Sequence, residues 1–450
     1  MHFCTSTRTA VLLLILNLGL ATVSAQGIGD SPYSAYGFGD LLPTGQVSQA
    51  LMAGTGLAIT EPYSVLLGNP ASYSALARPV FEAGISFRST RSSSSLKSTS
   101  ASDANFTGFS IGIPFARGKW GLAMGLTPFS DVSYSTGRTV AFDGGNVNYK
   151  YTGSGGLDRA FVGLGRTLYS QRADSLGNRG TQVRFGADFN FIFGSIEQTR
   201  DAVYVPGTGY YNTKAFTSLV LRSPTADASL VWQGDLTKKM VKDADNWRWS
   251  IGASVDLPAK FRASYSSLVT TYTVSTNIET VRDTTSNDQG VKGNVDLPVA
   301  FGLGIGVQNA RWAFTVEMKQ QDWSAVKLEV PGYQMPSPLR SALTTAAAVR
   351  FQPAIEGNIL HRAVYRFGYR HVDAPQQVRG LGLSGDAATV GISFPLNAVQ
   401  TNSWLHVGGE FGQRGSTADG LVQERYAALW VGLAFTPWRG ERWFTAPKIQ

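Results

Sequence analysis

The chain has 450 residues, of which 50 are glycine and 11% are aromatic, while only 16% are charged against about 25% in soluble domains. Beyond the N-terminal region no run of about 18 apolar residues occurs, which excludes a helical membrane protein. The net charge of +8 is mild, and no Lys/Arg cluster is interleaved with aromatic residues, so nucleic-acid binding is not expected. This combination of few charged residues with many glycines and aromatic residues is typical of a transmembrane β-barrel, whose strands face lipid on one side and a polar lumen on the other.

Residues 1–25 are predicted to be a signal peptide. Arg8 precedes an apolar run over residues 10–23, and Val23-Ser24-Ala25 provides small residues at a cleavage site. The only cysteine, Cys4, lies ahead of this run, so the exported chain would have no disulfide. The sequence therefore predicts export to the outer membrane of a Gram-negative bacterium.

Residues 26–78 are predicted to form an N-terminal hatch inside the barrel. They carry Gly, Pro and Ser without sustained periodicity, and they include the turn Gly68-Asn69-Pro70-Ala71. Irregular backbone can cross the membrane level only when it is buried in protein. The hatch also has apolar side chains that could line a path for a hydrophobic ligand or only pack against the wall. These are Val65, Leu66, Leu67 and Phe38.

From residue 79 to residue 450 the sequence alternates with period two, as a barrel wall requires. Near Trp312, for example, Phe314, Val316 and Met318 alternate with polar or small residues. Because bacterial barrels have even strand numbers, we predict an all-β, antiparallel transmembrane barrel of about 14 strands, with about 16 as the second choice. A soluble β-sandwich is the alternative, but the pattern continues without a break in composition.

Linkers and small residues suggest how the wall is built. Long polar linkers such as residues 277–290 are expected outside, and Pro258-Ala259 and residues 308–310 are expected to be short periplasmic turns. Pro258 and Pro298 end the repeats Val255-Asp256-Leu257-Pro258 and Val295-Asp296-Leu297-Pro298, which indicates that a strand stops at each proline. Gly302, Gly304 and Gly306 form a small inner face with room for the hatch or for a passage.

Charged residues at inward positions are candidate site residues. Three arginines are expected on the inner face of one strand, and four carboxylates on the inner faces of others. They could pair across the lumen or anchor the hatch, or the arginines could bind an anionic head group bidentately. The set comprises Arg362, Arg366, Arg370, Asp188, Asp256, Glu317 and Glu410.

No enzyme chemistry is expected. The stretch Gly108-Phe109-Ser110-Ile111-Gly112 matches the spacing of a nucleophile elbow, but strand alternation continues through it where a turn and helix would be needed. The histidines His361, His371 and His406 have no metal-ligand spacing. We therefore predict no catalytic residue, no metal and no cofactor.

Several patches together resemble the FadL-type outer-membrane transport family, in the form common among Bacteroidetes-like bacteria. They are the turn of the hatch, residues 151–157, residues 185–196, Asp322-Trp323-Ser324 and the closing segment from Glu424 to Phe435. The resemblance implies a barrel closed by a hatch and passive uptake of small hydrophobic compounds, such as long-chain fatty acids. The expected partners are then membrane lipids, a hydrophobic small-molecule ligand and other outer-membrane proteins.

The resemblance also implies an alternative, because some members serve as non-transporting accessory subunits of outer-membrane secretion or assembly complexes. The two functions differ in a feature that a structure can display. A transporter should have a continuous apolar tunnel that touches the hatch, whereas an accessory subunit should have a filled lumen.

Overall fold

The computed structural model describes residues 31–437 apart from residues 96, 117–118, 172–178, 206, 208, 237–245, 277, 355 and 397–402. The predicted signal peptide lies outside these described residues. Within them, no helix has the length and apolar character needed to cross a membrane.

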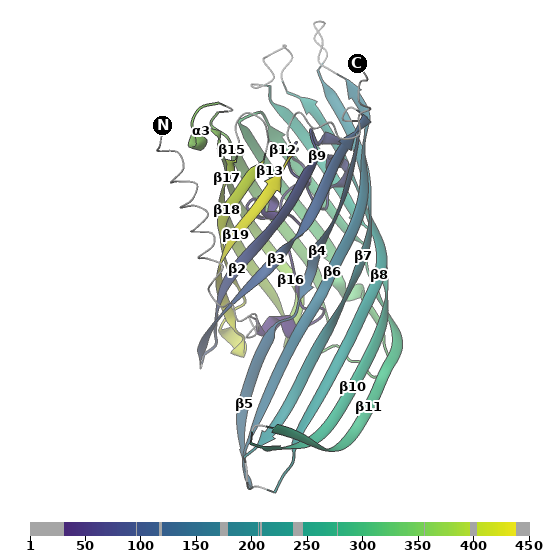
Figure 1. Cartoon of the computed structure of the whole chain (residues 1–450), viewed down its shortest axis with the longest axis vertical. Helices are drawn as coiled ribbons and strands as arrows, with labels where there is room; N and C mark the ends of the chain where they lie inside the picture. The colour runs from purple at the N-terminus through teal and green to yellow at the C-terminus, as the bar shows by residue number, and fades with distance from the viewer. Residues whose placement is uncertain are drawn as a thin grey trace, which may run out of the picture.

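The described chain is a closed antiparallel β-barrel, in which each wall strand pairs with the next and β19 pairs with β2 (Figure 1). The elements of the wall are β2 (Val80–Ser93), β3 (Ser98–Phe115), β4 (Trp120–Asp131), β5 (Tyr134–Phe142), β6 (Gly145–Gln171), β7 (Thr181–Tyr204), β8 (Asn212–Asp235), β9 (Arg248–Asp256), β10 (Ala259–Ser275), β11 (Ile278–Leu297), β12 (Ala300–Gln308), β13 (Trp312–Asp322), β14 (Lys327–Glu329), β15 (Ser341–Phe351), β16 (Val364–Val378), β17 (Leu381–Pro395), β18 (Trp404–Arg414) and β19 (Gln423–Phe435). The short helices η5 (Trp323–Ala325), α3 (Ile359–Arg362) and η6 (Ala418–Gly420) connect some of them.

The wall has 14 strands, as predicted, because four pairs of elements each continue one strand. These pairs are β4 with β5, β9 with β10, β11 with β12, and β13 with β14, and the two members of each pair bond to the same neighbouring strand or to successive parts of it. The first choice of the sequence analysis is thus confirmed.

The two proline repeats mark interruptions within strands. Pro258 separates β9 from β10, and Pro298 separates β11 from β12 at the same level, since Asp256 pairs with Ala300 and Ala259 pairs with Leu297. Proline lacks the N–H that a ladder needs, so it interrupts the pairing without reversing the chain. The predicted periplasmic turn at Pro258-Ala259 is therefore wrong.

The barrel is much taller on one side. Strands β6, β7 and β8 have 27, 24 and 24 residues, whereas β15 and β18 have 11 each. We call the end with the hairpins β5–β6, β7–β8 and β10–β11 the extended end, and the end where β2 begins and β19 ends the terminal end (Figure 1). Residues 278–290 of the predicted long linker are strand instead, because β11 (Ile278–Leu297) begins there.

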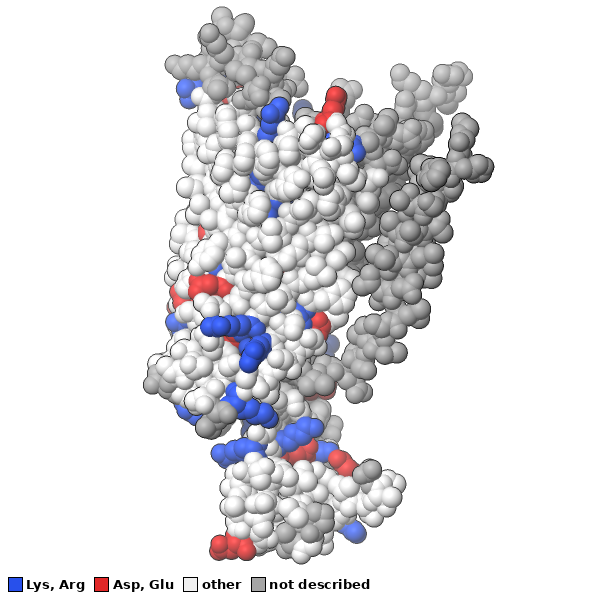
Figure 2. All heavy atoms as spheres, turned by 90° about the vertical axis from the view of Figure 1, so that its left-hand side faces the viewer, with Lys and Arg blue, Asp and Glu red and all other residues white. Residues whose placement is uncertain are grey.

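The outer face of the wall is apolar, and its inner face is small or polar. On β12, for example, Phe301, Leu303 and Ile305 are exposed at 58%, 54% and 61%, whereas the glycines between them are buried. In Figure 2 a band of the wall shows few charged side chains, and Lys, Arg, Asp and Glu lie at the rim above it and gather below it. This uncharged band is the surface that lipid would cover.

The hatch, residues 31–78 of the described chain, lies against the inner face of the wall. It contains η1 (Pro32–Ala35), β1 (Asp40–Leu41), α2 (Val47–Ala50) and η2 (Pro70–Ala75). Helix α2 packs on β18, β19 and β2, while η2 packs on β3, β4, β6, β7 and β8. Most of the hatch is buried, so its loops occur at membrane depth only where protein surrounds them.

One seam of the wall is incomplete, and the hatch occupies part of it. Strands β3 and β4 pair from Phe115–Trp120 only as far as Phe109–Leu126, and toward the extended end they separate. On the edge of β4 that β3 leaves, Asp40 and Leu41 of β1 pair with Asp131 and Ser130. The hatch thereby satisfies backbone groups that would otherwise form an open sheet edge.

Candidate functional site: the interface between hatch and wall

The predicted hatch turn is held by its own asparagine and by strand β8. Gly68 has a φ of +77°, a conformation that a side chain would strain, and it leads directly into Asn69. The Asn69 amide donates hydrogen bonds to the carbonyl oxygens of Gly56 and Leu57 at 2.8 and 3.1 Å. The Ser229 hydroxyl donates to Asn69 Oδ1 and accepts the N–H of Ala71, both at 2.9 Å.

Glycines in the wall let the hatch backbone approach. A Cβ on Gly121 would overlap the Tyr73 carbonyl group, and one on Gly165 or Gly186 would overlap the backbone of Pro70. On β12, a Cβ on Gly306 would overlap the Ala58 carbonyl oxygen. The small inner face that the sequence predicted is therefore filled by the hatch at these positions.

A buried ion cluster joins the hatch to β15 and β16. Glu61 Oε2 lies 3.0 Å from Arg366 Nη2, and Glu61 Oε1 lies 3.6 Å from Arg350 Nη1. Burial alone would raise the pKa of the Glu61 carboxyl, but the two guanidinium groups outweigh it and the pKa is lowered. Arg366, a predicted lumen residue, is thus an anchor of the hatch.

This cluster predicts that the hatch loosens in acid. A carboxyl whose pKa is lowered on folding contributes stability above its ordinary pKa of 4.5 and loses that contribution as the pH falls through the folded value. We expect wild-type protein to lose more stability below pH 4.5 than a Glu61→Gln variant, measured by urea unfolding in detergent micelles across pH. Parallel pH profiles for the two proteins would contradict this role of Glu61.

Glu317, another predicted lumen residue, binds the hatch through its backbone. Its carboxylate accepts the N–H groups of Gly56, Leu57 and Ala58 at 3.0, 2.8 and 3.1 Å. Three successive backbone donors are satisfied in this way by one buried side chain, and they would be costly to bury without an acceptor.

Replacement of Glu317 by glutamine is expected to weaken this attachment. The Glu317→Gln side chain keeps its shape but loses charge and one acceptor oxygen, so we expect a loss of about 1–2 kcal/mol in the free energy of unfolding. Urea unfolding measures the change, and the exposed Glu329→Gln substitution on β14 is the matched control. Equal stability of the two variants would contradict the proposed contact.

The remaining predicted charges mostly contact the wall or the hatch. The Tyr73 hydroxyl donates to Asp188 Oδ2 at 3.0 Å, so Asp188 also meets the hatch. Asp256 pairs with Lys319 at 2.6 Å, on neighbouring parts of the wall. Arg370 binds Glu410, which also accepts the Tyr426 hydroxyl at 2.8 Å.

Arg362 is not on the strand where the sequence predicted it. It ends the one-turn helix α3, whose Asn358 cap accepts the N–H of His361, and β16 begins only at Val364. Because Arg362 ends this helix and the strand begins two residues later, Arg362 does not join the inner row of Arg366 and Arg370. The prediction that these three arginines share one strand face is wrong for Arg362.

Sequence reasoning missed the ion cluster at the start of the hatch. Arg414 of β18 binds Asp40 of the hatch at 2.6 Å and also binds Glu424 of β19, while Ser31 donates to Glu424 at 2.8 Å. Glu61 was missed as well, although a signal was present, since it is the only charged residue between Asp40 and Arg78.

The four apolar side chains proposed as a ligand lining are all buried. Val65 and Leu67 pack with Tyr73 and Leu76, Leu66 packs with Met52, and Phe38 lies 6.0 Å from Trp323 between ring centroids. Of the four, Leu67 borders the cavity described next. Their role toward a ligand stays a prediction.

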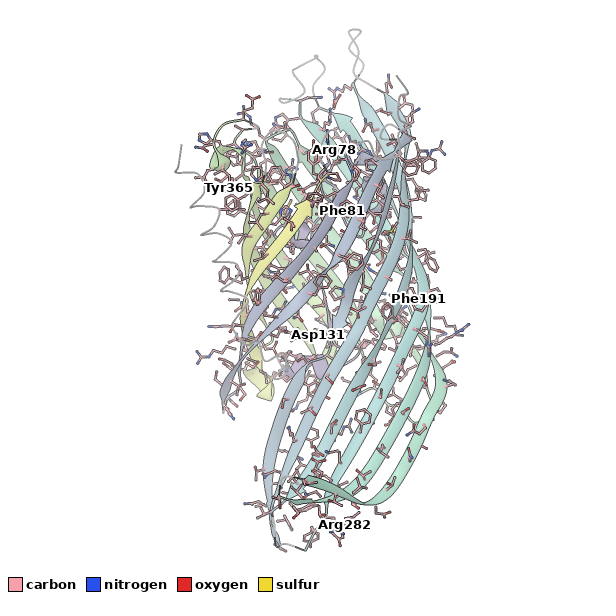
Figure 3. The ribbon with its side chains drawn as sticks, viewed as in Figure 1. Arg78, Phe81, Asp131, Phe191, Arg282 and Tyr365 are labelled. Atoms are coloured by element: carbon pink, nitrogen blue, oxygen red, sulfur yellow. The ribbon has the colours of Figure 1, made fainter. Side chains whose placement is uncertain are left out.

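A cavity of about 420 Å³ lies between the hatch and the wall. It extends to Phe106 and Pro128 at the separated seam of β3 and β4. Charged side chains from the wall and the hatch border it, and they include Arg88, Asp103, Asp131, Arg159, Asp256, Lys319 and Arg414. Figure 3 labels Asp131, which ends β4 and pairs with Asp40 of the hatch. A wholly apolar ligand in this cavity would desolvate these charged groups without hydrogen bonding to them, which is unfavourable. The cavity is therefore poorly suited to conduct a hydrophobic compound.

The motifs weighed for catalysis lie within strands. Residues 108–112 form part of β3, and Ser110 is 1% exposed with no helix following it. His406 Nδ1 lies 2.6 Å from Ser393 Oγ, but both side chains are buried and neither borders the cavity. No group of three His, Cys, Asp or Glu residues in the described part of the chain could hold a metal.

Comparison with solved structures defines the class. The chain is similar to a FadL homologue from Pseudomonas aeruginosa (TM-score 0.53, 11% identity), covering 88% of this chain and 99% of that one. It is also similar to the toluene transporters TbuX of Ralstonia pickettii and TodX of Pseudomonas putida (TM-scores 0.53, identities 12% and 13%, each covering 88% of this chain and 99% of the other). At these identities the likeness concerns the fold, and the protein is a β-barrel of FadL-like fold, a fold typical of bacterial outer membranes.

The family is more specific than the fold. The BamG family matches residues 7–450, and the chain belongs to this family. Among proteins of curated function, none matches the sequence. The predicted fold of the FadL-type family is confirmed, whereas the family to which the chain belongs is BamG.

Proposed function

We propose that the protein is a non-transporting accessory subunit of the outer-membrane barrel-assembly machinery. The observation that carries this proposal is the match of the BamG family to residues 7–450, since the family name associates its members with that machinery. The chain would act as a rigid membrane partner that contacts other subunits through its loops or its outer wall, without chemistry of its own.

The fixed hatch supports this proposal. Glu61, Glu317 and Asp40 each tie the hatch to a different part of the wall, through β15 and β16, β13 and β18 respectively. Separating the partners of a buried ion pair leaves an uncompensated charge and strongly destabilises a protein. Moving the hatch out of the lumen would require breaking several such contacts. The hatch occupies much of the lumen, and a filled lumen is the feature that the sequence analysis expected of an accessory subunit.

Passive uptake of a small hydrophobic compound is the second candidate. The separated seam between β3 and β4 and the cavity that reaches it favour this reading, as does the fold shared with the toluene transporters. This candidate corresponds to the predicted resemblance to FadL-type transporters of Bacteroidetes-like bacteria, and transport by this chain stays a prediction.

Native mass spectrometry of the protein distinguishes the two candidates. A chromosomally tagged copy would be extracted in mild detergent from its own outer membrane, with a tagged unrelated barrel of similar abundance as control. We expect a stable complex with barrel-assembly subunits and no small ligand. A monomer that carries a lipophile, lost on changing Leu67 to a charged residue, would overturn the proposal in favour of transport.

A further inference from the structure

Two arginines face each other on the outer wall where the lipid-facing surface ends. On β2 the exposed residues Ile85 and Phe87 point outward, and on β19 Leu429 and Leu433 do so. Further toward the extended end on the same outward rows, Arg91 pairs directly with Arg425. Both arginines are exposed, so they stand at the boundary between apolar wall and polar surface.

The residues around this pair do not neutralise it. In the same row of the sheet, Arg91 is flanked by Ser100 of β3, and Arg425 is flanked by Gln413 of β18. Arg91 Nε donates to Ser98 Oγ at 3.0 Å, and within the described chain no carboxylate forms an ion pair with either arginine. Like charges that face each other across a strand pair are destabilising, so the pair lacks a structural reason within the protein.

The nearest carboxylate in that row is already held. Asp386 of β17 pairs with Gln413 and lies two strands from Arg425. Its Oδ1 accepts the Tyr369 hydroxyl at 2.7 Å and lies 2.8 Å from His371 Nδ1. Asp386 therefore belongs to a separate polar group and leaves the arginine pair positive.

The same arrangement recurs on the opposite part of the wall. Arg222 of β8 pairs directly with Arg262 of β10, and both are exposed. On β8 and β9 the outward residues before this level are apolar, with Leu230 and Ile251 exposed at 44% and 45%. Lys260, Lys292 and Lys327 add positive charge in the neighbouring rows. Of the two carboxylates there, Asp296 pairs with Lys260 on one side and Lys327 on the other, and Glu329 lies two strands from Arg262. Two independent opposed arginine pairs at the same boundary indicate a common requirement.

We propose that each opposed arginine pair binds the phosphate group of an anionic lipid, a phosphorylated glycolipid, in the leaflet at the extended end. Cross-strand neighbours have Cβ atoms about 5 Å apart, so two guanidinium groups can grip one phosphate. Guanidinium forks bind phosphate through paired, charge-assisted hydrogen bonds. The acyl chains would then lie along the apolar rows that end at each pair. Figure 2 shows basic side chains gathered where the uncharged band ends on one face. The site does not depend on the proposed function.

The test measures lipid binding to the purified full chain in detergent by native mass spectrometry. The probes are lipid A, dephosphorylated lipid A and inorganic phosphate. Wild-type protein is expected to hold two lipid A molecules, Arg91→Gln/Arg425→Gln one, and the variant that also carries Arg222→Gln/Arg262→Gln none at the same lipid concentration. Each pair should account for about a tenfold change in affinity.

A matched control separates the site from net charge. Arg138 on β5 and Arg282 on β11 are exposed near the far end of the extension, well outside the apolar band, and Figure 3 marks the position of Arg282. Arg138→Gln/Arg282→Gln removes the same charge and should leave two lipids bound. Folding of each variant is checked by the heat-dependent shift of the barrel in gel electrophoresis.

Three outcomes would overturn the proposal. The first is equal lipid A binding in wild-type protein and the arginine variants, and the second is equal binding of the dephosphorylated lipid. The third is that inorganic phosphate displaces the lipid at similar concentration, which would assign the pairs to free anions. If the control loses lipid as much as Arg91→Gln/Arg425→Gln, general charge is the cause and the proposal also fails.

Discussion

Replacement of Glu61 by glutamine is expected to lower the free energy of unfolding by about 3–5 kcal/mol, because it leaves two buried guanidinium groups without a carboxylate. Arg350 and Arg366 converge on Glu61, whose side chain is 8% exposed. The Glu61→Gln variant keeps the shape of the residue, so the change reports the lost charge. Urea unfolding in detergent micelles, followed by gel mobility of the folded barrel, measures it.

The control for this result is an exposed ion pair. Lys214 and Glu279 pair on the extension, and the Glu279 side chain is 52% exposed. Surface pairs contribute about 0–1 kcal/mol, so Glu279→Gln should change stability little. A Glu61→Gln effect as small as that of Glu279→Gln would show that the hatch is held mainly by other contacts, and it would weaken the case for a permanently closed lumen.

Replacement of Gly121 by alanine should displace the hatch. The added Cβ would overlap the carbonyl group of Tyr73, and neither backbone can yield without breaking the packing of η2. Forcing extra atoms into a filled interior costs about 1–3 kcal/mol, and we expect Gly121→Ala to lie at about 3 kcal/mol because the clash is with backbone. Urea unfolding measures the loss.

A cysteine reports on the hatch itself in this variant. The only native cysteine is Cys4, within the predicted signal peptide, so Ala71→Cys would be unique in the exported protein. Ala71 is 0% exposed, and we expect its alkylation to be slow in an otherwise wild-type barrel and fast with Gly121→Ala. Gly409→Ala is the control, since its Cβ would meet its nearest neighbour at an ordinary 3.4 Å. If Ala71→Cys is alkylated at the same rate with Gly121→Ala as with Gly409→Ala, the hatch does not contact Gly121.

These predictions rest on contacts that join distant parts of the chain, and sequence patterns cannot reveal such contacts. Glu61 and Arg366 are separated by 305 residues, and Asp40 and Arg414 by 374. Which inward charge meets which depends on how the barrel closes and where the hatch enters. The sequence could place Arg366, Glu317 and Asp188 on the inner face, but it could not choose between pairing with the wall and anchoring the hatch.

The alternation of side chains by itself determined the class of fold. A strand in a wall between lipid and lumen must show apolar and polar residues in turn, and this period is local, so it can be read without knowing the partners. The Gly-rich, aperiodic residues before it likewise predicted a segment enclosed by protein, and the glycines of β12 predicted space for it.

Tertiary structure alone decided the interruptions, the seam and the paired arginines. Pro258 appeared to end a strand, yet the neighbouring strand is interrupted beside it and both continue, because pairing on either side of the break holds them in line. Likewise, Arg91 and Arg425 are 334 positions apart in sequence and meet only because β19 closes the barrel on β2. The period of a strand is encoded in its own residues, whereas register and neighbours arise from closure of the whole sheet.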